Sequence, residues 1–308
     1  MNKSDRIIRC FIVGASRSGT TLLQSIVASH PDLVSVPETG IVFDSVGDFD
    51  RRLFNIRRRG IKGWLRDSAA ATRISAGIRS RVDLRKRFST LEASLGLEEI
   101  GTVGRYRTTL KSVFRRFEET MDAGVSRSSA KGWVEKTPSH LHYIDVIKRF
   151  MPSAMFIHMI RPVADNAASI YDLALKHPEL HWGRYRNMNI LVRRMTQCVN
   201  AHDMWTHDDK HLFVDFQDIT GNTRMTAERI VQFLGLEFDS AMVGRDSGQS
   251  VIPDVPWQAA TRGPIDAQRG SKFGKVFNTE QQEYLCERLP EFSANVYAAI
   301  ARDRSRLE

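Results

Sequence analysis

The sequence predicts an α/β fold in which helices cover both faces of a central parallel sheet. Short apolar runs typical of buried strands alternate along the chain with segments of helical apolar spacing. No run approaches the roughly eighteen apolar residues that a membrane span needs. With 42% hydrophobic and 26% charged residues, the composition is that of an ordinary globular protein and excludes a disordered or fibrous chain.

The N-terminal region predicts a strand, a loop, a helix and a second strand in turn. The apolar run RCFIV at 9–13 is the first strand, and a glycine-bounded loop follows it at 14–21. Helical apolar spacing then extends over 21–30 and stops at Pro31. Residues 33–36 form the next expected strand.

A basic insertion interrupts this alternation at 44–131, where the pattern is helical and broken by glycines. Within it, residues 51–87 hold eleven arginines and two lysines against two aspartates, a net charge of +11. Such a block is either a solvated helical face or an electropositive wall for an anionic ligand. The aromatic residues of the block lack the regular spacing of a base-stacking surface, so we expect no nucleic-acid partner.

Strand and helix alternation resumes after the insertion, so we expect one domain over residues 1–308, although the length alone also fits two. The expected strands are 132–134, 154–160 and 211–216, and the expected helices are 139–150, 163–175, 223–234 and 281–301, the last interrupted at Pro290. A stretch rich in Gly, Pro and Ser at 243–274 predicts an irregular flap.

The N-terminus and the metal-binding residue types indicate the class of protein. The N-terminal apolar core is too short for a secretory signal, so we expect a cytoplasmic protein without a membrane span. The three cysteines lie far apart without a CxxC pair, which argues against a disulfide scaffold or a zinc ribbon. The spacing of His202, His207 and His211 matches no zinc motif, so we expect no metal.

The strongest local motif is the loop from Gly14 to Thr21, which stands between a strand and a helix. Its two glycines have the spacing of a Walker A loop, whose backbone N–H groups cradle an oxyanion. Thr20 stands where that motif needs lysine, and the loop carries its cation earlier, at Arg17. The loop therefore predicts anion binding in a P-loop NTPase-like three-layer fold, without the Mg²⁺-nucleotide chemistry of the lysine.

The segment GASRSGTTLLQSIVASHPDLVSVPET at 14–39 resembles the 5′-phosphosulfate loop of PAPS-dependent sulfotransferases. The arginine in the loop is most similar to bacterial carbohydrate-type and tyrosylprotein sulfotransferases. WVEKTP at 133–138 is similar to the central lysine strand of the family, and FIHMIRPVADNAAS at 156–169 to its 3′-phosphate strand and helix. VDFQDI and FLGLEF, between 214 and 238, complete the ordered set.

The resemblance implies PAPS as co-substrate, PAP as product, and no metal. The residues that it assigns to cofactor binding are Arg17, Ser18, Gly19, Thr20, Thr21, Arg161, Ser169, Lys272 and Gly274. In the family an arginine and a serine eight residues apart hold the 3′-phosphate, as Arg161 and Ser169 would here. The chain departs from the usual R-D-P-R by reading Arg-Pro-Val-Ala from Arg161, which removes a second cation near the cofactor.

The resemblance also assigns the catalytic residues. Glu38 stands where arginine-type enzymes carry their general base, and Lys136 and Arg17 would place positive charge near the sulfuryl group. His140 is the alternative base, offset by two residues from the histidine of cytosolic sulfotransferases, where this chain has Pro138. The expected acceptor is a hydroxyl or amine of a small molecule or carbohydrate, approached from the side of the 44–131 insertion.

Two other functions are compatible with parts of the sequence. Asp215 follows an apolar strand and could serve as the Walker B acid of a P-loop kinase, although the missing loop lysine counts against this. The basic block could also belong to a non-enzymatic protein that binds polyanions.

Overall fold

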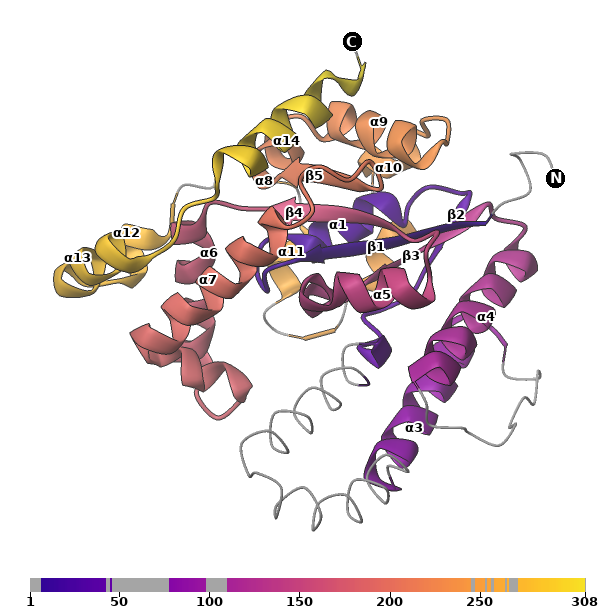
Figure 1. Ribbon diagram of the computed structural model, residues 1–308, viewed down its shortest axis with the longest axis horizontal. Coiled ribbons are helices and arrows are strands. Elements are labelled where there is room, and N and C mark those ends of the chain that lie inside the picture. Colours follow the sequence, from indigo (N-terminus) through magenta and orange to yellow (C-terminus); the bar gives the residue numbers. More distant parts are fainter. Residues whose placement is uncertain are drawn as a thin grey trace.

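Five parallel strands form the central sheet, in the order β2-β3-β1-β4-β5. The structure, a computed structural model, describes residues 7–42, 45, 78–97, 110–244, 247–252, 254–255, 258–263, 265 and 271–307. The strands are β1 (Ile8–Gly14), β2 (Leu33–Ser35), β3 (Gly132–Lys136), β4 (Met155–Ile160) and β5 (His211–Asp215). Each neighbouring pair is parallel, which confirms the predicted sheet (Figure 1).

Helices lie on both sides of this sheet (Figure 1). The α-helices of the described residues are α1 (Thr20–Val27), α3 (Ile78–Ser94), α4 (Leu110–Ser128), α5 (Ile144–Phe150), α6 (Val163–Lys176), α7 (Met188–Asp203), α8 (Phe216–Gly221), α9 (Thr223–Leu234), α10 (Ala241–Gly244), α11 (Ala259–Arg262), α12 (Phe273–Val276), α13 (Thr279–Arg288) and α14 (Ala294–Arg304). The 3₁₀ helices are η2 (Pro138–Tyr143), η3 (His181–Arg186), η4 (Ser247–Val251) and η6 (Ser305–Leu307).

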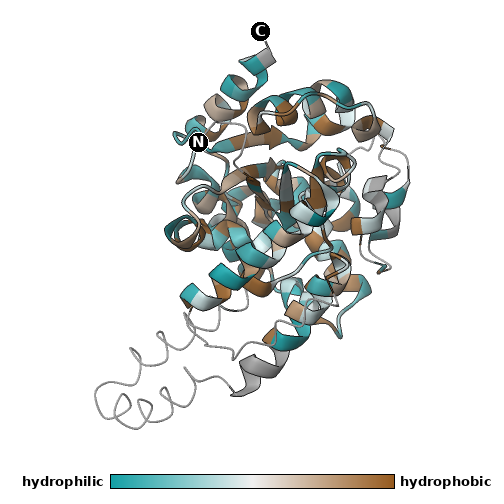
Figure 2. Cartoon of the chain, turned by 90° about the vertical axis from the view of Figure 1, so that its right-hand side faces the viewer, coloured by the Kyte–Doolittle hydropathy of each residue, from teal (hydrophilic) through white to brown (hydrophobic). Residues whose placement is uncertain are grey.

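Alternate residues of the strands point to the two faces of the sheet, and each face has its own helices. Phe11, Trp133 and Phe156 pack against α4 and α5 on one face. Ile12 and Ile157 pack with α1 and α9 on the other face. The apolar residues, brown in Figure 2, gather in the sheet and on the inward sides of these helices. The result is the three-layer arrangement that the alternation predicts.

The register of the strands determines which segments meet at the carboxyl end of the sheet. Ile12 of β1 pairs with Lys136, the last residue of β3, and Gly14 pairs with Met159 of β4. The loop after β1 therefore starts between the ends of β3 and β4. In parallel α/β sheets, ligands bind in the crevice at this end.

Most predicted elements are present, and the differences have local causes. The strand expected at 211–216 ends at Asp215, because the Asp215 side chain accepts a hydrogen bond from the backbone N–H of Gln217 and caps α8. The helix expected at 139–150 begins as the 3₁₀ helix η2 before α5. The sequence analysis did not predict α7, which Asn187 caps at its N-terminus. Among the described residues, no helix combines the length and apolarity that a membrane crossing needs.

Candidate active site

A pocket of about 580 Å³ opens at the carboxyl end of the sheet. Its lining comes from the loop after β1, the ends of β3 and β4, η3, α8, and the stretch between Val255 and Ile265. This volume lies within the range of small-molecule and cofactor sites. Of the predicted site residues, the lining includes Arg17, Gly19, Thr20, Thr21, Glu38, Lys136 and Arg161.

The loop after β1 needs glycine at two positions. Gly19 adopts a left-handed backbone conformation with φ 109° at the N-cap of α1. A Cβ added there would lie 2.6 Å from a ring carbon of Phe216, and a Cβ on Gly14 would lie 2.9 Å from the Met159 carbonyl oxygen. The close approach of β4 and α8 thus fixes the loop that begins α1.

Ser18 is buried within this loop and does not line the pocket. Its hydroxyl has no hydrogen-bond partner among the described residues. The loop backbone is held from α6, since the Asn166 side chain donates to the Ser16 carbonyl at 2.9 Å. A buried hydroxyl beside a helix N-terminus is a donor suited to an anion.

Arg161 at the end of β4 closes one side of the loop. Its Nη1 donates to the Arg17 carbonyl at 3.0 Å, and its guanidinium carbon lies 4.7 Å from the centre of the Phe216 ring. Stacking on Phe216 orients the planar guanidinium. The structure therefore brings Arg161 and Arg17 into one pocket although 144 residues separate them.

Lys136 and Glu38 meet in the same pocket. Lys136 Nζ lies 2.8 Å from Glu38 Oε2, and the lysine side chain is only 1% exposed whereas the glutamate side chain is 42% exposed. The lysine is the last residue of β3, and the glutamate follows β2, the neighbouring strand. Parallel pairing of these two strands explains why residues so far apart in sequence form an ion pair here.

A second carboxylate, Glu135, lies buried directly behind this pair. Its Oε1 accepts hydrogen bonds from the hydroxyls of Thr39, at 2.9 Å, and Thr137, at 2.6 Å, and its Oε2 lies 3.0 Å from His140 Nδ1. Burial alone would raise the pKa of Glu135, but attraction to His140 and these hydrogen bonds outweigh burial and lower it. Glu135 is therefore an ionised carboxylate that anchors the residue after Glu38.

His140, the alternative base, is itself fully buried and is not among the pocket-lining residues. Its Nδ1 faces Glu135. A base must reach the proton that it removes, directly or through one water. The geometry favours Glu38 over His140 for that role.

Besides Ser18, three predicted cofactor residues do not line the pocket. Ser169 is buried in the interior of α6. Lys272 pairs with Asp172 of α6 at 3.1 Å, and the exposed Gly274 lies in α12. Their assignment to the 3′-phosphate stays a prediction. Arg269 and Gly270, shortly before Lys272 in the chain, lie outside the described residues.

The sequence analysis missed a group of aromatic and basic residues that also line the pocket. They come from η3 and α7, and they are His181, Trp182, Arg184, Tyr185 and Arg194. The alternation of aromatic and basic residue types in HWGRYR at 181–186 is the signal that could have indicated them.

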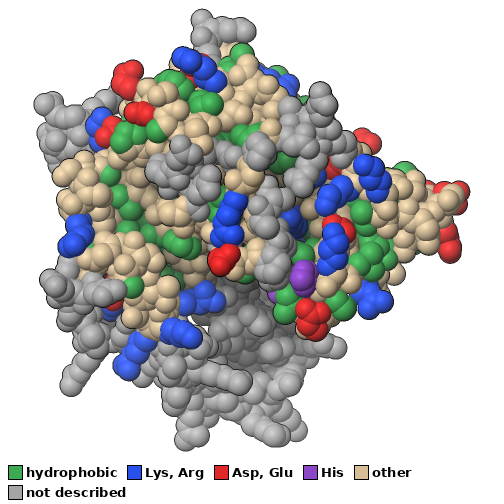
Figure 3. Space-filling model, turned by 180° about the vertical axis from the view of Figure 1, so that it is seen from behind, with side chains coloured by type: hydrophobic (Ala, Val, Ile, Leu, Met, Phe, Trp, Pro, Cys, Tyr) green, Lys and Arg blue, Asp and Glu red, His purple; other side chains and the backbone are tan. Residues whose placement is uncertain are grey.

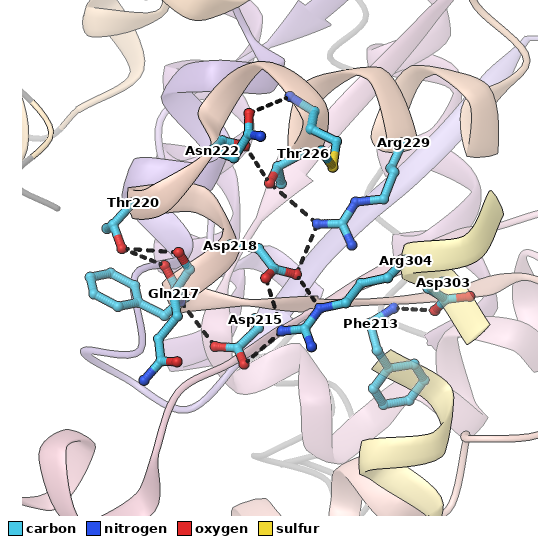
Figure 4. A network of polar contacts seen from close by, with 12 residues as sticks. Phe213, Asp215, Gln217, Asp218, Thr220, Asn222, Thr226, Arg229, Asp303 and Arg304 are labelled. Atoms are coloured by element: carbon cyan, nitrogen blue, oxygen red, sulfur yellow. Dashed lines mark hydrogen bonds and ion pairs between the residues drawn. The ribbon is translucent and has the colours of Figure 1, made fainter. Parts of the chain in front are cut away.

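Asp215, the possible Walker B acid, takes part in contacts that hold α8 and the C-terminal helix α14 in place (Figure 4). It caps α8 and lies 3.4 Å from Arg304, and Asp218 beside it pairs with Arg229 and Arg304 at 2.9 Å each. Asp215 is not among the pocket-lining residues. A carboxylate that pairs with Arg304 outside the pocket does not match the Mg²⁺ ligand of a kinase.

The histidines near 202–211 are also engaged elsewhere. His202 and His211 both contact His158 of β4, while His207 is exposed. In the described part of the chain, no group of three or more His, Cys, Asp or Glu side chains is arranged to hold a metal ion.

The basic block lies mostly outside the described residues, which include only its last part in α3. From that part Arg87 lines the pocket and donates to the Thr39 carbonyl at 2.7 Å. On the face seen in Figure 3, the described Lys and Arg side chains lie as separate spots, several of them beside an acidic side chain. That face offers no continuous basic surface of described residues for a polyanion.

Solved structures of other proteins resemble this chain in fold. The sulfotransferase domain of the Synechococcus PCC 7002 olefin synthase is 17% identical, with a TM-score of 0.52 over 98% of this chain and 97% of that one. Mouse sulfotransferase SULT7A1, solved in complex with PAP, is 12% identical with a TM-score of 0.49, over 92% of this chain and 83% of that one. Among curated proteins, none matches.

The family of this chain follows from its match to a family model. The model described as the sulfotransferase family matches residues 10–240. This range includes the anion-binding loop, the Lys136–Glu38 pair and Arg161. It also covers most of the 308 residues. The chain therefore belongs to the sulfotransferase family.

Proposed function

We propose that this protein transfers a sulfuryl group from PAPS to a hydroxyl or amine of a small-molecule or carbohydrate acceptor. The observation that carries the proposal is the 2.8 Å contact between Lys136 and Glu38 in the pocket that Arg17 and the residues 19–21 also line. One pocket thus combines an anion-binding loop, a buried cation and a half-exposed carboxylate. Transfer of a charged group to a hydroxyl needs these three elements.

The loop residues fit the phosphosulfate end of PAPS. Gly19 leaves no space for a Cβ, the buried Ser18 hydroxyl has no described partner, and Thr20 and Thr21 begin α1. Backbone N–H groups at a helix N-terminus favour an anion, and Arg17 adds a cation. Arg161, stacked on Phe216, supplies a forked donor for the 3′-phosphate.

The residues of the pocket account for each charge in the transfer. As the acceptor oxygen forms its bond to sulfur, the bond from sulfur to the phosphate oxygen breaks, and PAP leaves with the electron pair. Glu38 takes the acceptor proton. The ammonium of Lys136 has three donor hydrogens, so it can hold Glu38 and also stabilise charge on the sulfuryl oxygens.

The proposal also includes that the 44–131 insertion lies on the side from which the acceptor approaches. Its support is Arg87, which lines the pocket and ties α3 to the segment that carries Glu38. The assignment of Ser169, Lys272 and Gly274 to the 3′-phosphate is also kept as a proposal, on the resemblance alone.

Two variants test the two halves of the site separately. Glu38→Gln keeps the shape of the side chain, so PAP affinity should hardly change while turnover falls by about 10²–10⁴. Arg161→Ala removes a charge-assisted donor from a group that does not react, so PAP affinity should fall by roughly 1.5–3 kcal/mol. Calorimetry with PAP and initial rates with labelled PAPS measure both effects.

The matched control is Glu283→Gln, which neutralises an exposed glutamate of α13. It should change neither PAP affinity nor turnover. Near-normal turnover of Glu38→Gln would place the base elsewhere. Tighter binding of ATP with Mg²⁺ than of PAP would contradict the whole proposal and favour a kinase.

A further inference from the structure

One part of the pocket holds aromatic and basic side chains to which the binding of PAPS, the sulfuryl donor, assigns no role. In η3, the ring centres of His181 and Trp182 lie 4.3 Å apart, and those of Trp182 and Tyr185 lie 6.3 Å apart. Arg184 lies over the Tyr185 ring at 4.9 Å and donates to its hydroxyl at 3.1 Å. The Trp182 indole N–H is buried and has no hydrogen-bond partner among the described residues.

Two arginines of this region carry charges that no acidic side chain of the described residues neutralises. Within the described ranges, neither Arg184 nor Arg194 forms an ion pair with a carboxylate. Arg194 instead lies 2.7 Å from His142 Nε2. Burial and then Arg194 lower the pKa of His142 to about 4, so this imidazole is neutral near pH 7.

The other charged residues of the pocket have assigned roles, and Arg87 among them donates to the Thr39 carbonyl. Glu38 is the one acidic residue among the described lining residues, and it pairs with Lys136. In the proposed function Arg17, Lys136 and Arg161 serve the donor. Arg184 and Arg194 therefore leave an excess of positive charge on the η3 and α7 part of the pocket.

We infer that η3 and the adjoining part of α7 form the acceptor subsite, and that the acceptor is anionic. It is a ring-bearing alcohol with a carboxylate, phosphate or sulfate group. This inference rests on the proposed function, because it takes the loop and Arg161 as the donor side. Forked guanidinium donors suit each of these anions, and the aromatic rings give a flat contact for the ring of the acceptor.

The placement also explains how such an acceptor would react. Trp182, Arg184 and Arg194 line the same pocket as Glu38, so a molecule held by its anionic group can present a hydroxyl to that carboxylate. Holding a reactant in one orientation lowers the barrier of the transfer. A neutral alcohol would lack the ionic contacts and should bind more weakly.

Calorimetry on PAP-loaded protein tests the inference by comparing the affinities of a neutral probe and of anionic probes. The neutral probe is para-nitrophenyl β-glucoside. The anionic probes are the matching glucuronide, whose C6 is a carboxylate, and the 6-phosphate and 6-sulfate esters of the glucoside. At least one anionic probe should bind about 10-fold or more tightly than the glucoside, as expected for a charge-assisted contact. If none does so, the inference is wrong. PAP occupies the phosphate positions of the donor side and prevents the anionic probes from binding at those positions.

Variants identify the subsite. Arg184→Gln, at an exposed side chain, should remove most of the preference for the anionic probe, and Arg194→Gln should do the same. The controls are Arg186→Gln and Arg193→Gln, at exposed arginines of the same two helices that do not line the pocket. These controls should retain the preference. Equal losses in all four variants would show only a general charge effect and would overturn the assignment.

Failure of the inference and failure of the proposed function give different results. If PAP does not bind and labelled PAPS transfers no sulfate to any acceptor, the proposed function is wrong. If PAP binds but the neutral probe binds as tightly as the anionic ones, only the anionic acceptor subsite is wrong.

Discussion

Two buried polar groups, one with a single histidine and one with three, lie on the same face of the sheet and differ in their chemistry. At the end of β3, His140 lies 3.0 Å from the carboxylate of Glu135. Across β4 and β5, His158 contacts two other histidines and no carboxylate. We call the first the carboxylate cluster, which also includes Thr39 and Thr137, and the second the histidine chain.

Stacked rings separate the two groups. Phe11 contacts the His140 ring at 5.7 Å and stacks on Phe156 at 5.7 Å, and Phe156 stacks on His211 at 4.8 Å. Both groups therefore border the same layer of stacked aromatic rings. What differs is the partner of the imidazole.

In the histidine chain, each contact joins two imidazoles. His158 Nδ1 lies 2.9 Å from His202 Nδ1, and His158 Nε2 lies 2.8 Å from His211 Nδ1. Neutral imidazoles can satisfy both contacts, because each has one N–H and one acceptor nitrogen. Burial, and then His142, lower the pKa of His202 to about 3. Burial also lowers the pKa of His211 to about 3, although the Asp208 carboxylate acts in the opposite direction.

The comparison teaches that burial alone does not decide whether a polar group is charged. Burial opposes charge in both groups, yet the pKa of Glu135 falls, which favours its ionised form, while the pKa of His158 falls, which favours its neutral form. In the carboxylate cluster, hydroxyl donors and a facing imidazole stabilise the ionised form of Glu135. In the histidine chain His158 contacts only imidazoles, and Asp208, the nearest acid to His211, also pairs with Lys148.

The largest expected effect is a loss of stability in mild acid through the histidine chain. Unfolded histidines bind a proton near pH 6.5, whereas His202 and His211 in the folded state do so only near pH 3. Their contribution to stability is therefore complete above pH 6.5 and is lost as the pH falls toward 3. Each such histidine costs about 1.4 kcal/mol per pH unit, so the free energy of unfolding should fall by several kcal/mol between about pH 6.5 and 5.

Urea unfolding at a series of pH values measures this loss. His142, with a pKa lowered to about 4, and His181, also lowered, act in the same direction. The variant His158→Phe keeps the stacking on Phe213 and should lose less stability between pH 7 and 5 than the parent. A free energy of unfolding that stays constant over this range would contradict the neutral histidine chain.

The sequence supported most of the fold because its signals were local. Apolar runs indicated the strands, and Pro290 separates α13 from α14 as expected. The loop, Lys136 and Arg161 stand at the ends of parallel strands, which is why the sequence could place them in one site. It could not indicate that Glu135 faces His140, because that contact depends on how η2 folds back beside β3.

Other features were missed although their signals were present. Leu191, Met195, Cys198, Val199 and His202 have the spacing of one buried helical face, which is the pattern of α7. The pocket-lining role of Trp182 and Arg184 depends on how η3 packs back against α6. No local pattern fixes such a contact.

The second prediction concerns the carboxylate cluster and has an intermediate effect. Glu135→Gln removes the charge that His140 faces while keeping the shape, so the free energy of unfolding should fall by about 3–5 kcal/mol. Urea unfolding near pH 7 measures the loss. Exposed Glu179, changed to Gln, is the control and should alter stability by no more than about 0.5 kcal/mol.

The double variant with His140→Gln sharpens this comparison. If the two groups interact, the double change should cost less than the sum of the single changes. Additive losses would show that Glu135 and His140 are independent. The acid profile adds a separate test, because the folded pKa of Glu135 is depressed. Its contribution is present above about pH 4.5 and is lost only below it, so it lies outside most of the histidine window.

The smallest expected effect comes from Thr39→Val, which removes one hydroxyl donor from Glu135 without changing the size of the side chain. The stability loss should be about 1 kcal/mol, the net value of one hydrogen bond, because the Thr39 backbone N–H still donates to Glu135. Thr39 follows Glu38 directly, however, so a looser anchor should lower kcat by up to about 10-fold with PAP affinity unchanged. Urea unfolding, initial rates and calorimetry with PAP separate these effects. An unchanged kcat together with the stability loss would mean that other contacts, such as the one from Arg87 to the Thr39 carbonyl, hold Glu38 in place.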